Sequence, residues 1–411
     1  MKKATLSLGF CIALTGQAIS QSGLNSIYSA FGIGDVQMRD YSGYGGMGAL
    51  GVAMPSEKTL NDINPASYGF FPSNRLTMEL SLGGKTINYI SSSQYTSGGD
   101  FTIQKAAMGV SLFKNWGTSF GIKRYSNIDY LTLGDRYLLG TESKLSSKIE
   151  GHGGLYNFFF SNGFKIGRHL NLGLTIGYIS GSVNRTEEIL SSATDAVTLE
   201  KNTLYQNFIM NTGIQYQFKT GKVKWIAGAT FQPRRTLNTT VDNLVSDASG
   251  NTLVAQKARS GHFEYPAQWG AGLTMIRKEW KFGVDHIGQN WSAVNYSGIG
   301  FQTTNASNWA AGFSYHKPRQ TIFGVVDGIT YSAGITWDQS YLVIDGVQIN
   351  SLAGTAGISV PSRNGLYQYH FSVKAGQKGK STYPLVKEKF VEFNINLSLS
   401  SILYTGGRKY D

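Results

Sequence analysis

The sequence predicts an all-β protein, a transmembrane antiparallel β-barrel of about fourteen strands with an N-terminal hatch. Three observations support this prediction. The chain begins with a segment typical of exported proteins, apolar and polar residues alternate in many later stretches, and short and long connections follow one another between those stretches. We expect three parts: a signal peptide (1–20), a hatch or plug (21–73) and a β-barrel (74–411).

The composition fits a barrel wall that faces lipid on one side and a polar interior on the other. Charged residues make up 15% of the 411-residue chain, against roughly 25% in ordinary soluble domains. Aromatic residues make up 13%, and there are 51 glycines. The net charge of +12 could suggest nucleic acid, but we see no basic block along a helix and no RNA-binding motif. We therefore expect contact with outer-membrane lipid and lipopolysaccharide, and no contact with nucleic acid.

The N-terminal segment has the layout of a Sec signal peptide. Two lysines precede the apolar stretch 6–14, and Ala18 and Ser20 occupy the positions that a signal peptidase reads. Cys11, the sole cysteine, lies in this segment, and Phe10 before it does not suit a lipoprotein. No later segment has about 18 consecutive apolar residues, as a helical span would need. We expect Sec export, cleavage near Ser20 and insertion into the outer membrane of a Gram-negative cell.

The barrel strands are predicted from alternation with period two. In 391–399, for example, every odd position is apolar and every even position is polar. About fourteen stretches alternate in this way. They are 75–83, 103–113, 116–126, 153–164, 168–182, 203–218, 222–233, 264–277, 279–290, 306–316, 328–338, 350–360, 365–375 and 389–401.

The connections predict an orientation. Tight turns are expected at 114–115, 165–167, 219–221 and 278, and long polar loops are expected between them. The long loops are 84–102, 127–150, 183–202 and 234–263. Outer-membrane barrels place short turns in the periplasm and long loops outside. Tryptophans gather near the ends of the alternating stretches, as expected of aromatic girdles. They are Trp116, Trp225, Trp269, Trp280, Trp309 and Trp337.

Residues 21–73 do not alternate and are rich in glycine and other small residues. They also contain apolar residues that need burial, which favours a plug in the lumen over a free periplasmic tail. Gly43, Gly45 and Gly48 match a dinucleotide-binding pattern, but no strand, helix or suitably placed acid accompanies them. We therefore do not expect nucleotide binding.

Nothing in the sequence predicts catalysis. None of the six histidines is paired at metal-ligand spacing, and no nucleophile-elbow motif occurs. The candidate lumen carboxylates Glu79, Asp285 and Glu392 belong to distant strands. We expect no enzyme activity, no cofactor and no metal.

Two short motifs before the first strand resemble the hatch of the FadL-type outer-membrane transporters of hydrophobic compounds. The motif residues are Gly45, Gly46, Met47, Gly48, Asn64, Pro65 and Ala66. Tyr265-Pro266 and the pair Asp285 and Trp291 are similar to the middle strands of that family, and the stretch 348–374 is similar to FadL-related, PorV-like barrels. The resemblance spans most of the predicted mature chain.

The resemblance implies gated passive uptake of hydrophobic compounds such as fatty acids. In that family the hatch blocks the bore, and a kink in the third strand opens a side door to the membrane. Here the third strand is 116–126, and Gly117 and Gly121 could permit a kink. An apolar passage is suggested by lumen-facing positions, for which contact with the hatch is an equal alternative. These positions are Phe113, Phe159, Ile179, Ile209 and Ile226.

A second function stays open, because barrels of this group also serve as non-transporting subunits of outer-membrane secretion or assembly complexes. Transport predicts an apolar tunnel from the outer loops to the hatch. A subunit role predicts a filled lumen, protein partners and an exposed apolar or aromatic patch outside the lipid band. A general porin is disfavoured by the hatch.

Overall fold

The computed structural model describes residues 26–39, 42–91, 95–137, 144–192, 195–294, 296–298, 300–321 and 324–402. The predicted signal peptide lies outside these residues. The strands of the wall are β2 (Arg75–Ile90), β3 (Tyr95–Phe113), β4 (Trp116–Tyr137), β5 (Lys144–Ile166), β6 (Leu170–Ser192), β7 (Asp195–Thr220), β8 (Val223–Gln232), β9 (Arg235–Asp247), β10 (Thr252–Tyr265), β11 (Gln268–Arg277), β12 (Trp280–Gln289), β14 (Ala306–Thr321), β15 (Gly324–Ile344), β16 (Val347–Pro361), β17 (Tyr367–Lys378) and β18 (Lys387–Ile402). The remaining elements are the 3-10 helices η2 (Ile27–Ala30), η3 (Gly45–Met47), η4 (Pro65–Phe70) and η5 (Trp291–Ala293), and the short strands β1 (Asp35–Val36) and β13 (Phe301–Thr303).

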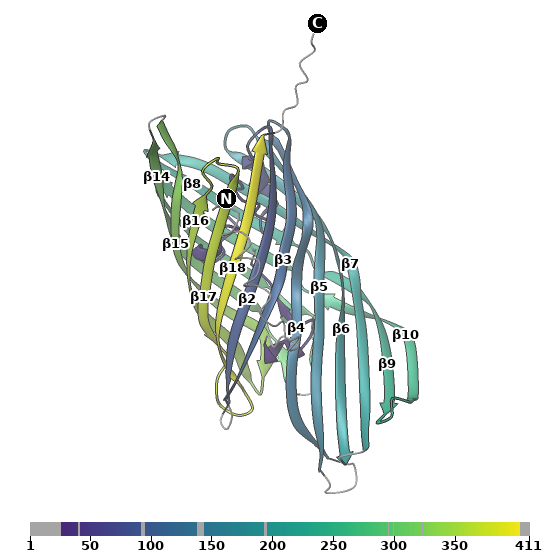
Figure 1. Cartoon of the computed structure of the whole chain (residues 1–411). Coiled ribbons are helices and arrows are strands. Elements are labelled where there is room, and N and C mark those ends of the chain that lie inside the picture. Colours follow the sequence, from purple (N-terminus) through teal and green to yellow (C-terminus); the bar gives the residue numbers. More distant parts are fainter. Residues whose placement is uncertain are drawn as a thin grey trace, which may run out of the picture.

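The wall closes as an antiparallel barrel (Figure 1). Closure occurs between β18 and β2, whose pairing runs from Lys387 opposite Ile90 to Ile402 opposite Arg75. Two wall strands are interrupted at prolines, which cannot donate to the ladder. Pro233 separates β8 from β9, Pro266 separates β10 from β11, and each pair counts as one strand of the wall. The described residues therefore form the fourteen-stranded barrel that the sequence predicts.

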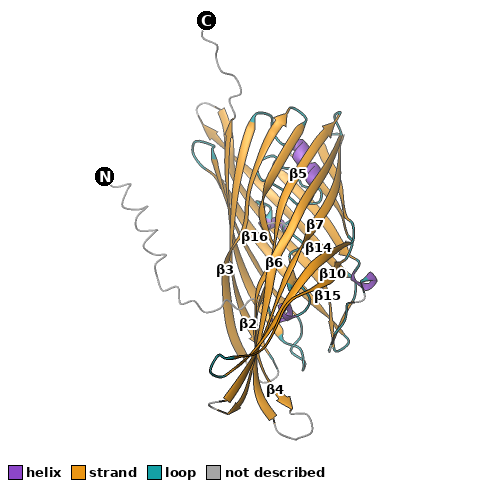
Figure 2. Ribbon diagram, turned by 90° about the vertical axis from the view of Figure 1, so that its right-hand side faces the viewer, coloured by secondary structure: helices purple, strands orange, loops and turns teal. Residues whose placement is uncertain are grey.

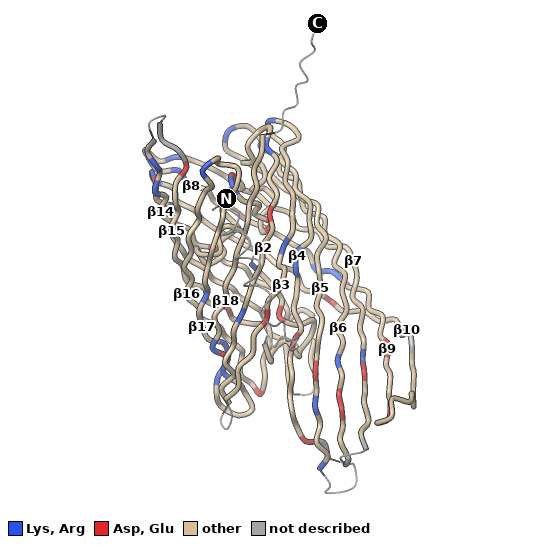
Figure 3. The backbone as a smooth tube through the Cα atoms, viewed as in Figure 1, with Lys and Arg blue, Asp and Glu red and all other residues tan. Residues whose placement is uncertain are grey.

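The polar stretches expected as loops are largely strand, and this expectation was wrong. β4 continues to Tyr137 and β5 begins at Lys144, so most of 127–150 is a paired hairpin. The same holds for β6 with β7 and for β9 with β10. A strand beyond the lipid band needs no apolar face, so hydropathy understates its length. Figure 3 shows the charges of β5, β6, β7 and β9 on these protruding parts.

The barrel has two unlike rims. The turn rim carries the tight connections at 114–115, 167–169, 221–222 and 278–279, together with the start of β2 and the end of β18. The hairpin rim carries the long hairpins. On the outer-membrane pattern the turn rim faces the periplasm.

The outer face of the wall is an apolar band bounded by aromatic rows. Towards the hairpin rim, Trp269 lies 4.7 Å from His286 between ring centroids, and His286 lies 4.2 Å from Trp309. Trp337 pairs opposite Trp309 on the next strand. A second row lies at the turn rim and consists of Trp116, Trp225 and Trp280. No helix in the described part of the chain is long and apolar enough to cross a membrane.

Residues 26–39 and 42–74, which we call the inner segment, run through the bore (Figure 2). Ser26 contacts Glu388 near the hairpin rim, and Phe71 packs near Gly117 at the turn rim. The segment therefore passes down the bore before the chain enters β2.

Candidate functional site

The first contact region of the inner segment is η3, which holds the predicted motif residues Gly45, Gly46, Met47 and Gly48. Thr355 of β16 ties it to the wall, because its Oγ1 donates to the Gly46 carbonyl and accepts from the Gly48 N–H, both at 2.9 Å. Gly48 has a left-handed φ of 71° as the C-cap residue of η3. Met47 is buried with Leu50 in a small apolar cluster.

The second contact region is η4, which begins at the predicted Asn64-Pro65-Ala66 motif. Asn64 is its N-cap residue, and its Oδ1 accepts from the Ala66 N–H at 3.0 Å. The Asn64 Nδ2 donates to Val52 O at 2.6 Å and to Ile214 O at 3.1 Å. This one side chain therefore caps a helix, braces the inner segment and holds it to β7.

Glycines of the wall let the inner segment lie directly on the backbone of the barrel. Gly117, Gly163, Gly173 and Gly213 pair side by side across β4 to β7, and we call this row the glycine floor. A Cβ on Gly173 would lie 2.2 Å from the Ala66 nitrogen. A second row carries η3 and consists of Gly283, Gly312 and Gly334. Glycine permits this close approach because it has no side chain.

Buried charges fasten the inner segment to β2 and β3. The Lys105 Nζ lies 2.7 Å from Asp62 Oδ2 and 3.1 Å from Glu79 Oε2, and it donates to Leu60 O at 2.8 Å. Glu79 in turn accepts from the Leu60 N–H at 2.7 Å. Burial alone would raise the pKa of the Asp62 carboxyl, but the charges of Lys105 and Lys123 hold this pKa below its usual value.

Two further carboxylates of the wall bind the inner segment. Asp285 Oδ2 accepts from the N–H groups of Gly51 and Val52 at 2.7 and 2.8 Å. Glu388 accepts from the Ser26 hydroxyl and from the Ile27 N–H, each at 2.9 Å. The carboxylates that the sequence showed on distant strands, Glu79 and Asp285, are therefore both attachment points for one segment.

The predicted apolar lumen positions do not line an open passage. Phe159 packs against the inner segment, beside Tyr68 and Phe71. Ile179 and Ile209 belong to a large buried cluster nearer the hairpin rim, and Ile226 is fully buried. That cluster also contains the aromatic residues Tyr28, Tyr125, Phe263, Tyr265, Trp291 and Tyr341.

Phe113 does not face the lumen, and its placement there was wrong. Its side chain is 68% exposed, and its ring stacks on that of Trp116 at 5.8 Å. A register shift between Ser111 and Phe113 explains the error, because one extra residue in a strand moves the next side chain to the other face.

The wall opens beside the third strand. β3 and β4 pair only as far as Lys105 opposite Lys123, and beyond this point β3 follows β2 while β4 follows β5. Figure 1 shows the two strands diverging below this level. Side chains bridge the split, since Arg124 donates to Thr102 Oγ1 at 2.6 Å and Asn127 donates to Asp100 at 3.2 Å.

The predicted kink residues lie on the turn-rim side of the split, where β3 and β4 are paired. Gly117 belongs to the glycine floor, and a Cβ there would lie 2.4 Å from Tyr68 O. Gly121 faces the backbone of Ala106 and Ala107 on β3. The irregular residue of the third strand is Tyr125, where the pairing of β4 with β5 shifts register.

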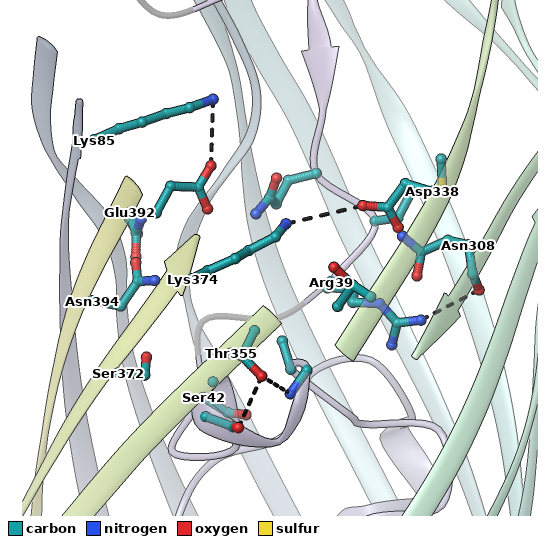
Figure 4. A pocket seen from close by; sticks show the side chains of 18 of the residues that line it. Arg39, Ser42, Lys85, Asn308, Asp338, Thr355, Ser372, Lys374, Glu392 and Asn394 are labelled. Atoms are coloured by element: carbon teal, nitrogen blue, oxygen red, sulfur yellow. Dashed lines mark hydrogen bonds and ion pairs between the residues drawn. The ribbon is translucent and has the colours of Figure 1, made fainter. Parts of the chain in front are cut away.

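The central cavity of the bore has a mixed lining, in which charged and amide side chains lie beside apolar ones such as Met38, Ile349 and Phe390. Its volume is about 170 Å³, and it lies between residues 35–49 of the inner segment and the strands β14 to β18 and β2. Figure 4 shows charged side chains entering it from different elements. Lys85 lies 3.4 Å from Glu392, and Lys374 lies 4.0 Å from Asp338. The paired charges in this lining offer hydrogen-bonding partners for water and other polar groups.

Comparison with known proteins supports the fold. The Ralstonia pickettii toluene transporter TbuX is 14% identical, with a TM-score of 0.59 over 87% of this chain and 97% of that chain. A Pseudomonas aeruginosa FadL homologue is 12% identical, with a TM-score of 0.58 over 89% and 98%. The Pseudomonas putida toluene transporter TodX is 15% identical, with a TM-score of 0.57 over 90% and 100%. The FadL-type resemblance is thus confirmed at the level of the fold.

The family assignment rests on a second comparison. No curated protein matches the chain. A family model described as BamG matches residues 1–411, the whole of the chain, and the chain therefore belongs to the BamG family.

Proposed function

We propose that this protein is an occluded outer-membrane barrel that serves as a fixed, non-enzymatic subunit of a larger outer-membrane secretion or assembly complex. The observation that carries the proposal is an apolar patch on the sheet that rises beyond the hairpin rim. We call it the crest patch, and it consists of Ile189, Val197, Leu199, Val245 and Val254.

The crest patch is continuous across four strands. Ile189 pairs opposite Val197, Leu199 opposite Val245, and Val245 opposite Val254. Val197 and Leu199 are each 38% exposed and Val254 is 57% exposed. Alternation along β7 places Leu199 on the same face as the buried Thr203, which is the inner face of the sheet.

The patch lies well away from lipid. Leu199 precedes Phe208, an exposed aromatic residue of the apolar band, by nine residues, which is about 30 Å along a strand. Apolar patches that neither lipid nor the protein's own core covers are typical of protein interaction sites.

The filled bore supports the same proposal. Withdrawing residues 59–68 would take Asp62 away from Lys105, and it would remove the hydrogen bonds that Glu79 accepts from Thr59 and Leu60. Breaking a buried ion pair by removing one side costs about 3–5 kcal/mol. Withdrawal of the whole inner segment would also break the hydrogen bonds to Asp285 and Glu388. The inner segment is thus built as a permanent part of the barrel.

The test compares two variants of one strand. Leu199→Glu places a charge in the crest patch, and Thr198→Glu places the same charge on the opposite face. We expect the wild-type chain, extracted from native membranes in mild detergent, to migrate in a stoichiometric complex on native gels. Leu199→Glu should release the chain from that complex as a single subunit, and Thr198→Glu should not. A wild-type chain that migrates alone would contradict the proposal.

A second function, passage of hydrophobic compounds, is favoured by the split beside the third wall strand. Arg124→Ala would remove the hydrogen bond that bridges the split to Thr102. If the split is a side door, this variant should take up radiolabelled fatty acid faster than wild type in proteoliposomes. Uptake equal to that of protein-free vesicles for both chains would rule this function out.

A further inference from the structure

We propose that the bore contains a conduit for water and small hydrophilic solutes, which carries charged side chains along its length, leads from the split between β3 and β4 to the turn rim and is closed where Gly43 meets His370. The conduit is made of three cavities in series. It is distinct from the crest patch and does not depend on the function proposed above.

The first cavity opens at the split. Its volume is about 80 Å³, and its lining includes Asp100, Thr102 and Arg124, the side chains that bridge the gap. It shares Lys85 and Glu392, among other residues, with the central cavity, so the two adjoin. A solute that enters here meets carboxylates, ammonium groups and amides.

The third cavity leads to the turn rim. Its volume is about 180 Å³, and its lining includes Lys278 and Glu279, which form the turn between β11 and β12. Glu57 and Lys58, which also line it, are exposed. Each of the three cavities is large enough for several water molecules.

The central and third cavities meet at one constriction. They share four lining residues, Gly43, Ser332, Ser359 and His370. The His370 Nδ1 lies 2.6 Å from Ser359 Oγ, which fixes the ring, and the side chain is buried. A Cβ on Gly43 would lie 2.6 Å from His370 Cε1, so the backbone of the inner segment rests against the imidazole.

The lining determines which solutes suit the conduit. Side chains of both signs alternate along it, with Asp100 and Arg124 at the split and Lys374 and Asp338 in the central cavity. A hydrophobic compound would displace water from these charges without replacing its hydrogen bonds. Small ions and neutral hydrophilic solutes carry or accept such hydrogen bonds, as in polar pores.

The test measures ion conductance of the purified chain in planar bilayers. His370→Ala should raise the conductance at least tenfold over wild type, because it removes the ring at the constriction. The matched control is His316→Ala, which alters another histidine of the third cavity away from the constriction and should behave as wild type. Lys374→Glu, added to His370→Ala, should shift the selectivity towards cations.

Two results would overturn the proposal. One is a folded His370→Ala chain that conducts no more than wild type. The other is conductance whose ion selectivity does not respond to Lys374→Glu, since the current would then follow another path.

A second measurement uses variants that keep His370, so its result does not depend on whether His370→Ala folds. The chain beyond the predicted signal peptide has no cysteine. Ser372→Cys in the central cavity and Ser314→Cys in the third cavity should therefore react selectively with a small charged methanethiosulfonate. Ser161→Cys, buried against Thr175 and outside the three cavities, should not react. Unreactive cysteines at both cavity positions would contradict a water-filled conduit.

Discussion

Lys105 on β3 places its ammonium group 2.7 Å from the Asp62 carboxylate of the inner segment, and both side chains are almost fully buried. The contact joins a residue of the wall to a residue of the inner segment, and the two are 43 positions apart in the sequence. The docking of the inner segment therefore depends on a buried ion pair as well as on complementary shape, and breaking such a pair by removing one partner is strongly destabilising.

Lys105→Met should loosen the inner segment. The substitution removes the cation that bridges the buried carboxylates of Asp62 and Glu79, at a cost of about 3–5 kcal/mol. Hydrogen exchange of residues 56–71 should accelerate while the barrel strands stay protected. Lys144→Met is the control, because its exposed pair with Asp135 is worth at most about 1 kcal/mol. Equal protection of residues 56–71 in both variants would show that the buried pair does not hold the segment.

Acid should loosen the same residues. The folded-state pKa of Asp62 lies below its unfolded value, so its contribution to docking is present above the ordinary carboxyl pKa of about 4 and is lost as the pH falls through the folded value. Hydrogen exchange of residues 56–71, corrected for intrinsic rates, should rise between pH 7 and pH 3. Asp62→Asn should remove most of this pH dependence. A wild-type protection pattern that is the same at both pH values would contradict the prediction.

The glycine floor should tolerate no side chain. In Gly173→Val the new Cβ would lie 2.2 Å from the backbone of Ala66, and overpacking of this kind costs roughly 1–3 kcal/mol or more. The heat-modifiable band of the variant on gels should convert at a lower temperature than that of wild type. The control is Gly354→Val, where no atom lies within 4 Å of the new Cβ. An equal fall in the conversion temperature for both variants would show that valine destabilises these strands in general and that contact with the inner segment is not the cause.

The barrel was predictable from the sequence because lipid outside and polar groups inside impose period two on every wall strand. The strand ends were not, since beyond the lipid band nothing requires an apolar face, and β4 to β7 continue in polar residues. The prediction for Phe113 was wrong because a β-bulge reverses which residues of a strand face inward, and the sequence shows no sign of the bulge.

The contacts between the inner segment and the wall were only partly predictable from the sequence. Asn64-Pro65-Ala66 is a readable helix start, and the apolar residues of 21–73 indicate burial. The partners of Lys105 and the glycine floor depend on register between strands, which one sequence does not reveal. The sequence does contain one indication of this contact, namely glycines that recur at inward positions such as Gly163, Gly173 and Gly213. Only the strand pairing shows that they form one row, on which the inner segment lies.

The most direct test of the central claim, an occluded barrel that acts as a subunit, is mass spectrometry of the protein purified from its native membrane in mild detergent. We expect one stoichiometric protein partner and no hydrophobic compound retained in the bore. A chain recovered alone, with fatty acid or a similar compound bound within the barrel, would contradict the claim and favour transport.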